Sequence, residues 1–133
     1  MTSASDRCVC RTRSDSRPSI RAEWIRPGTH VSSVGYKPPS GELPRELLGA
    51  ARLFVETRTA SAPTPVGCAE LQGLDPSAST ELGEVVQSTR PGRHDAEEIT
   101  VYKAMGHVIE DMIAAEIAVR TARERGVGQT LRR

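Results

Sequence analysis

The sequence has few aromatic residues and no excess of charge. Its 133 residues include one Trp, one Phe and two Tyr, so a core must be built from Val, Leu, Ile, Met and Ala. The 18 Lys and Arg nearly balance the 17 Asp and Glu, which gives a formal charge of +1 and no global field to attract nucleic acid or a membrane. The arginines before Pro27 come without interleaved aromatic residues to stack on bases, so we interpret them as a solvated basic segment. We expect no nucleic-acid partner and no membrane partner.

Cysteine and long apolar runs are also scarce. The three cysteines, Cys8, Cys10 and Cys68, form no C-x-x-C pair, so the spacing typical of a zinc site with histidine is missing and we predict no metal site. No segment resembles a secretory signal, and the longest apolar stretch is interrupted by Glu116. We therefore expect a cytoplasmic protein whose cysteines behave as small hydrophobic residues.

The strongest pattern lies in residues 98–126. A β-branched and aromatic run at residues 99–102 predicts a short strand. After this strand, apolar residues recur at the spacing i, i+3, i+4, i+7, i+8, which places them on one face of a helix. They are Met105, Val108, Ile109, Met112 and Ile113. Further apolar positions broaden this surface, so we predict a core or interface helix that packs against more than one neighbour and ends before Gly126.

Earlier in the chain, two predicted strands flank a short helix. Residues 30–36 contain a predicted strand that ends at Gly35, residues 43–51 an amphipathic helix, and residues 52–57 a second strand. We also expect a very short strand at residues 8–10 and a helix at residues 80–86 that Thr80 caps. A strand–helix–strand unit favours a parallel sheet, whose ligands bind at the carboxyl ends of the strands, here residues 35–37 and 57–58.

Established active-site motifs are missing. The sequence has no G-x-G-x-x-G between a strand and a helix, no Walker A, no H-E-x-x-H and no G-x-S-x-G. The fragment Gly126-Val127-Gly128 follows a helix, so we interpret it as a helix end. Physical reasoning therefore stops at an α/β sheet with a loop at residues 35–41 that is suited to a ligand.

Several short motifs nevertheless occur in a recognisable order. They are HVSSVG at 30–35, EL at 42–43, LGEV at 82–85, PGR at 91–93, EITVYK at 98–103 and ED at 110–111. Together they resemble the ornithine cyclodeaminase/mu-crystallin family over roughly residues 8–128. The resemblance implies NAD(P)-dependent chemistry, either cyclodeamination of ornithine or reduction of cyclic imines or keto acids. Members of the family combine a Rossmann domain with a second domain for substrate binding and dimerisation.

The resemblance covers only the family's C-terminal part. It implies an α/β fold, the C-terminal half of a Rossmann-type parallel sheet plus a long C-terminal helix, with Met1 in the middle of a truncated domain. A truncated gene or a mis-called start codon would both explain this. We expect a disordered N-terminus at 1–7, a partial NAD(P)-binding domain at 8–104, a helix at 105–128 that packs on a dimerisation region, and a tail at 129–133.

The resemblance also assigns residues to the cofactor, NAD or NADP. Thr12 falls near the loop after the fourth Rossmann strand, which borders the cofactor. The strand end that lines the nicotinamide side is matched by Val31, Ser32, Ser33 and Val34. Ala104 takes a position near the cofactor that a small hydroxyl residue usually holds, and Met105 takes the adjacent apolar position that faces substrate.

Lys37 departs from the family pattern. It stands at or beside the position where the cyclodeaminases carry an acid that handles the substrate amine. A cation does not accept a proton from an ammonium group, which argues against ornithine cyclodeamination. We predict no catalytic residue in this chain and expect it to be inactive alone, as part of a homo-oligomeric oxidoreductase or lyase that acts on a small amino or imino acid. The alternative is a non-enzymatic α/β domain that self-associates through its C-terminal helix.

Overall fold

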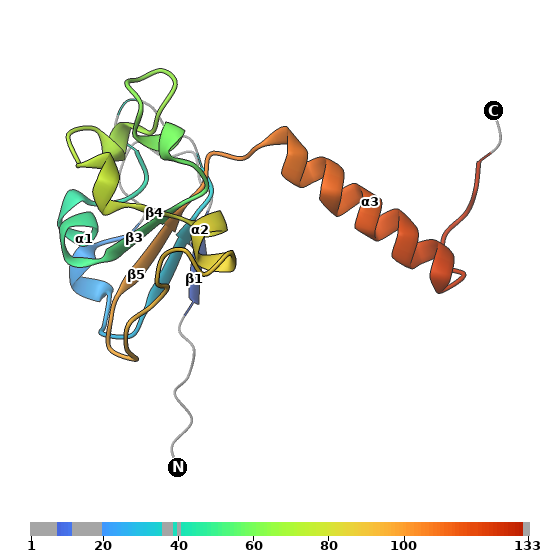
Figure 1. Cartoon of the computed structure of the whole chain (residues 1–133), viewed down its shortest axis with the longest axis horizontal. Coiled ribbons are helices and arrows are strands. Elements are labelled where there is room, and N and C mark those ends of the chain that lie inside the picture. The colour runs from blue at the N-terminus through green and yellow to red at the C-terminus, as the bar shows by residue number, and fades with distance from the viewer. Residues whose placement is uncertain (1–7, 12–19, 36–38, 40, 132–133) are drawn as a thin grey trace, which may run out of the picture.

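A computed structural model of the chain describes residues 8–11, 20–35, 39 and 41–131, and its centre is a parallel sheet (Figure 1). Within those residues the strands are β1 (Cys8–Arg11), β2 (His30–Ser33), β3 (Arg52–Val55), β4 (Thr80–Glu81) and β5 (Thr100–Lys103). Their order is β1-β2-β5-β3-β4, and every neighbouring pair is parallel. The predicted α/β class and parallel sheet are confirmed. The segment 1–7, expected to be disordered, lies outside the described residues.

One face of the sheet carries the core. Side chains alternate between the two faces of a strand, so Val31, Leu53 and Val101 share a face, as their pairing register requires. Helix α1 (Arg45–Ala50) contributes Leu47 and Leu48 to the same buried cluster. This arrangement confirms the predicted amphipathic helix at residues 43–51.

The order of the strands differs from a simple strand–helix–strand unit. β2 and β3 are not neighbours, because the last strand, β5, lies between them and pairs with both. The central strand thus comes from a segment about fifty residues after β3 begins.

The predicted helix at residues 80–86 is shorter and capped differently. Thr80 belongs to β4, and α2 (Leu82–Val86) begins after Glu81. The side chain of Glu81 accepts from the backbone of Glu84, and the Glu84 side chain accepts from the Glu81 N–H at 2.9 Å. This reciprocal capping box satisfies two backbone N–H groups at the start of α2, and Thr80 pairs instead with Phe54 of β3.

Short 3-10 turns connect the regular elements. They are η1 (Ala22–Trp24), η2 (Arg58–Ser61), η3 (Ala69–Leu71) and η4 (Pro76–Ala78). Three of them lie in residues 58–80, which the sequence predicted as mostly loop. Among them, η3 buries Glu70 and Leu71 and brings an acidic side chain toward the sheet.

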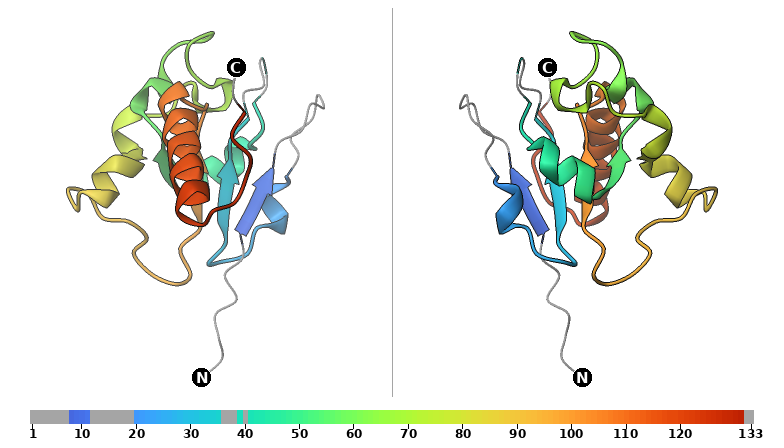
Figure 2. Two further views of the ribbon diagram at one scale, coloured as in Figure 1. Left: turned by 90° about the vertical axis from the view of Figure 1, so that its right-hand side faces the viewer. Right: turned by 90° about the vertical axis from the view of Figure 1, so that its left-hand side faces the viewer.

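The last helix, α3 (Val108–Glu124), projects away from the sheet (Figures 1 and 2). It begins at Val108 rather than at the predicted Met105, because Gly106 has a φ of +82° and the His107 side chain accepts from Ile109 N. None of its residues is buried. The interpretation as a core helix is therefore wrong for this chain, whereas packing on a dimerisation region stays a prediction. Among the helices of the described residues, none combines the length and the apolar composition of a membrane-spanning segment.

Candidate functional site

The carboxyl ends of the three central strands lie side by side. The register pairs Lys103 of β5 with Ser33 of β2 on one side and with Val55 of β3 on the other. Because all strands run in one direction, the loops that follow them leave from the same edge of the sheet. This is the edge at which ligands bind in open α/β folds.

A fully buried lysine organises this edge. Lys103 is 0% exposed, and its Nζ donates to Ser33 Oγ at 3.0 Å and to the carbonyl of Gly35. The same Nζ lies 3.0 Å from Glu70 Oε1 and 3.6 Å from Glu42 Oε2. A buried ammonium is tolerated only when it is paired and hydrogen-bonded, and both conditions are met here.

The two carboxylates tie the strand ends to loops that are distant in sequence. Glu42 Oε2 accepts from Ser33 Oγ at 2.6 Å and from Gly35 N at 3.1 Å. Glu70 Oε1 accepts from Glu42 N at 3.2 Å. We call Ser33, Glu42, Glu70 and Lys103 the Lys103 cluster. The Lys103 cluster therefore binds the backbone on both sides of the loop after β2, at Gly35 and at Glu42.

The charges of the Lys103 cluster affect the pKa of Cys68. Burial is the main cause that raises the pKa of its thiol to about 11, and the carboxylates of Glu70 and Glu42 add to the rise while Lys103 opposes it. The thiol is thus neutral at ordinary pH, as expected for a small hydrophobic residue of the core.

Glu56 sets the path of the chain after β5. Its Oε2 accepts from the backbone N–H groups of Met105 at 3.0 Å and Gly106 at 3.1 Å. Its Oε1 is buried and has no hydrogen-bond partner among the described residues. The carboxylate therefore holds the turn between the sheet and α3.

Arg58 links the end of β3 to α2. Its guanidinium donates to Glu84 Oε2 at 2.7 Å, and its backbone N–H donates to Glu81 Oε1 at 2.7 Å. The hydrogen bond from Arg58 is the main cause that lowers the pKa of Glu84. The acidic pair at positions 81 and 84 is thus a set of ion-pair and capping groups.

The sequence-predicted cofactor residues separate into three environments. Ser33 and Ala104 meet at the strand edge, where Ala104 N donates to Ser33 O at 3.0 Å, and Val34 beside them is 48% exposed. Val31 is fully buried in the core, and Ser32 lies on the opposite face and is half-buried. The predicted substrate residue Met105 is half-buried and packs against the core. Thr12 and Lys37 lie outside the described residues.

Sequence reasoning missed three members of the Lys103 cluster. Lys103 stands two residues after Val101, so strand alternation could have placed it on the buried face. Glu42 and Glu70 carry no local signal, because they approach Lys103 only after the chain has folded. They are separated by 28 residues and meet through a backbone-to-carboxylate hydrogen bond.

Comparison with known proteins shows which family the chain belongs to. A model of the ornithine cyclodeaminase/mu-crystallin family matches residues 3–126, nearly the whole chain. The chain belongs to this family. The ketimine reductase mu-crystallin of Mus musculus is 38% identical over 101 residues, which cover 75% of this chain and 31% of that protein. A Delta(1)-pyrroline-2-carboxylate reductase of Bacillus thuringiensis is 30% identical over 130 residues, which cover 90% of this chain and 39% of that protein.

Solved structures of similar proteins share the fold. Delta(1)-pyrroline-2-carboxylate reductase of Thermococcus litoralis, in complex with NADH and L-proline, aligns with a TM-score of 0.71 and 30% identity over 93% of this chain and 39% of that one. Iminosuccinate reductase of Paracoccus denitrificans, in complex with NAD+, aligns with a TM-score of 0.70 and 26% identity over 95% of this chain and 40% of that one. This member of the ornithine cyclodeaminase/mu-crystallin family thus spans 31% to 40% of the relatives named here.

Proposed function

We propose that this chain forms the nicotinamide-facing strand edge of an NAD(P)-dependent enzyme that acts on small amino or imino acids. The observation that carries the proposal is the edge where β2 and β5 end side by side. There an exposed Val34 stands beside the buried Lys103 cluster. Family membership supports a dinucleotide as the ligand, and the names of the reductases among the relatives support an imine as the substrate class.

The residues at this edge fit one end of a dinucleotide. Val34 and the backbone around Ala104 offer an apolar surface with fixed geometry, which suits a flat nicotinamide ring. The two glycines of the loop after β2, Gly35 and Gly41, offer no place for the pyrophosphate. A Cβ at Gly35 would meet the carboxylate of Glu42, and one at Gly41 would meet that of Glu70, so neither glycine leaves space for a phosphate.

Each residue at the edge has a specific role in this proposal. Val34 packs against the nicotinamide and excludes water from one side of the ring, while Met105 borders the substrate. The Lys103 cluster holds Ser33 and Gly35 in place and thereby fixes the direction in which Val34 points. When bound, the dinucleotide supplies the hydride for reduction of an imine. With Lys37 at or beside the acid position, we favour reduction over ornithine cyclodeamination.

Binding to isolated halves of the cofactor tests the proposal. In NMR titrations with reduced nicotinamide mononucleotide, we expect shifts at Val34 and Ala104, whereas AMP at the same concentration should leave these signals unchanged. Val34→Lys should reduce the nicotinamide-induced shifts at least tenfold. Val86→Lys is the matched control, because Val86 is also an exposed valine but lies on α2, and it should have no effect. Shifts confined to other parts of the chain, or equal effects of the two variants, would refute the proposal.

A further inference from the structure

The Lys103 cluster holds more negative than positive charge. Its one cation, the ammonium of Lys103, is shared by the carboxylates of Glu42 at 3.6 Å and Glu70 at 3.0 Å, so one negative charge is in excess. The Lys103 side chain is fully buried, and those of Glu42 and Glu70 are only 9% and 2% exposed. Water and salt therefore screen this excess charge weakly.

Neighbouring charges add to the imbalance. Glu56 places a third carboxylate at the same edge, where it accepts from two backbone N–H groups that follow β5. Arg58, the cation at the end of β3, already pairs with Glu84 at 2.7 Å and with Glu81 at 3.7 Å. Taken with the cluster, these residues leave the carboxyl edge of the sheet anionic.

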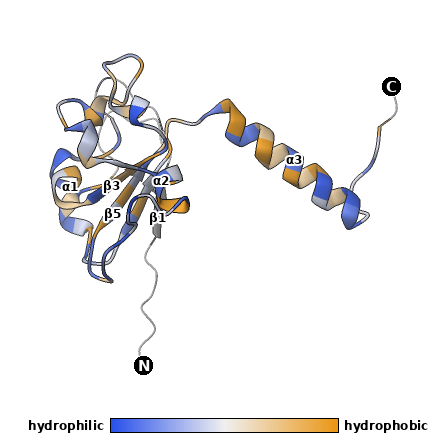
Figure 3. Cartoon of the chain, in the orientation of Figure 1, coloured by the Kyte–Doolittle hydropathy of each residue, from blue (hydrophilic) through white to orange (hydrophobic). Residues whose placement is uncertain are grey.

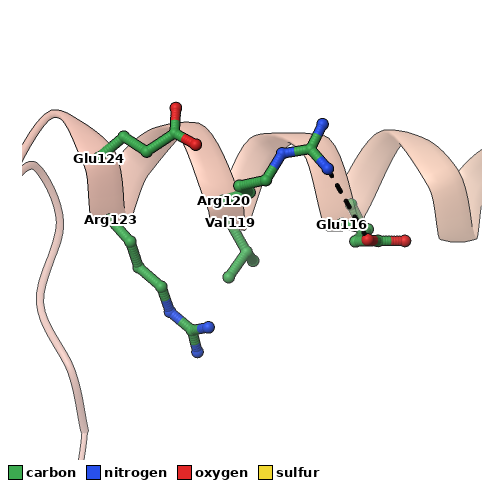
Figure 4. Close-up of a pocket in the computed structure, with 6 residues that line it drawn as sticks. Glu116, Val119, Arg120, Arg123 and Glu124 are labelled. Carbon is green, nitrogen blue, oxygen red and sulfur yellow. Dashed lines mark ion pairs between the residues drawn. The ribbon is translucent and has the colours of Figure 1, made fainter.

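The arginines near the end of α3 are not part of this edge. The helix extends away from the sheet (Figure 3). Arg120 and Arg123 line a hollow on α3 itself, where Arg120 pairs with Glu116 at 4.0 Å (Figure 4). The anionic character of the edge therefore comes from the strand ends and the loops around them.

An anionic edge distinguishes the two oxidation states of a nicotinamide ring. The ring carries one positive charge when oxidised and is neutral when reduced, whereas the rest of the dinucleotide is unchanged. Ser33 and Gly35 both donate to Glu42 of the cluster, and they are the chain neighbours of Val34. The cluster thus lies directly behind the segment proposed to contact the ring. Charge near a cofactor ring is one of the ways in which a protein sets the ring's electronic properties.

We propose that the excess negative charge of the Lys103 cluster makes this edge bind oxidised nicotinamide in preference to reduced nicotinamide. The inference rests on the proposed function. It assigns Glu42 and Glu70 a role in cofactor specificity in addition to holding the loop after β2. The imine reduction favoured above leaves the ring in its cationic form, so the preference acts in the direction of that reaction.

Titration of the full chain with oxidised and with reduced nicotinamide mononucleotide measures the preference, because both forms carry the same phosphate. The NMR shifts of Val34 and Ala104 give the two dissociation constants, and the original chain should bind the oxidised form at least about threefold more tightly. Glu70→Gln keeps an oxygen that accepts from Lys103 and from Glu42 N but removes one negative charge. It should lower the preference at least about threefold, and Glu42→Gln should lower it in the same direction.

Two further variants separate the effect of charge from that of position. Ser33→Ala removes a hydrogen bond to Glu42 without changing any charge, so it should affect both forms equally and leave the preference within about 1.5-fold. Glu98→Gln also removes one carboxylate from an ion pair, here with Arg52. Because Glu98 precedes β5 at the opposite end of the strand from Lys103, this variant should leave the preference equally unchanged.

The outcomes distinguish this inference from the proposed function. A preference that Glu70→Gln and Glu42→Gln leave unchanged, or tighter binding of the reduced form by the original chain, would overturn the inference while the proposed function stands. An equal loss of preference in Ser33→Ala or Glu98→Gln would overturn it as well. If neither form binds the original chain, the proposed function fails and the inference fails with it. Urea unfolding of each variant checks that the proteins compared are folded.

Discussion

At the scale of single residues, the buried ammonium of Lys103 should dominate the stability of the strand edge. Lys103→Met keeps most of the aliphatic stem but leaves the carboxylates of Glu42 and Glu70 buried without their cation. Breaking a buried ion pair in this way costs about 3–5 kcal/mol. Urea denaturation measures the loss, and Arg26→Met at an exposed position should change the free energy of unfolding by less than about 0.5 kcal/mol. Similar values for the two variants would contradict this prediction.

Substitution by alanine at two glycines should change the stability of the fold in opposite directions. A Cβ at Gly35 would collide with the Glu42 carboxylate, whereas a Cβ at Gly49 in α1 would have no neighbour within 4 Å. Gly35→Ala should therefore cost about 1–3 kcal/mol through overpacking. Gly49→Ala should be neutral or stabilise the protein by about 0.5–1 kcal/mol, because alanine loses less backbone entropy in a helix. Thermal unfolding of both variants compares them, and a stable Gly35→Ala protein would show that the loop tolerates displacement.

The thiol of Cys68 should make stability depend on pH in alkaline solution. Its pKa is about 11 in the folded chain against an ordinary value of 9.0, so the folded state favours the neutral thiol. The contribution is fully present below pH 9 and is lost as the pH rises toward 11, at about 1.4 kcal/mol per pH unit.

Cys68→Ala isolates this contribution from the other groups that titrate in the same range. The difference in unfolding free energy between the original chain and Cys68→Ala should be constant from pH 7 to pH 9 and should shrink above it. A difference that stays constant up to about pH 10.5 would mean that the thiolate is tolerated in the folded state.

At the scale of the elements, the two parts of the C-terminal segment contribute very differently to stability. β5 is the central strand and pairs with both β2 and β3, whereas α3 has no buried residue. A chain that ends at Gly106 should keep its thermal midpoint within about 3 °C, compared at a concentration low enough for both chains to be monomeric. A chain that ends at Asp95 lacks β5 and should not fold cooperatively. Unfolding of the first variant at room temperature would show that α3 supports the sheet.

At the scale of the whole molecule, we expect no turnover from this chain by itself. Glycine-rich turns and helix N-termini provide most of the anchoring of a dinucleotide, and the sequence contains no G-x-G-x-x-G motif. Purified chain mixed with NADH or NADPH and Δ1-pyrroline-2-carboxylate, or with ornithine and NAD+, should give the same absorbance change as a blank. Turnover above the blank that co-purifies with the chain would contradict this prediction, whether or not the nicotinamide titration succeeds.

Local sequence determined the elements and the family. The short apolar runs of β2 and β3 and the leucine spacing of α1 are properties of neighbouring residues, and they predicted those elements to within about two residues of the observed ends. The family assignment was equally accessible, since its motifs can be read in order along the chain. Helix periodicity also predicted α3, but not its first turn, where Gly106 and His107 delay the start.

Tertiary structure alone decided where these elements lie and which polar groups meet. Nothing near β3 indicates that β5 inserts between it and β2, because strand order depends on pairing between distant segments. The contact of Lys103 with Glu42 and Glu70 also depends on distant segments. It is favourable because the groups are buried, and they become buried only after the sheet and its loops have assembled. Periodicity showed that α3 has an apolar face, but only the structure showed that no other described residue of this chain buries that face. The reason is that an apolar face predicts a packing partner without showing whether the same chain provides it.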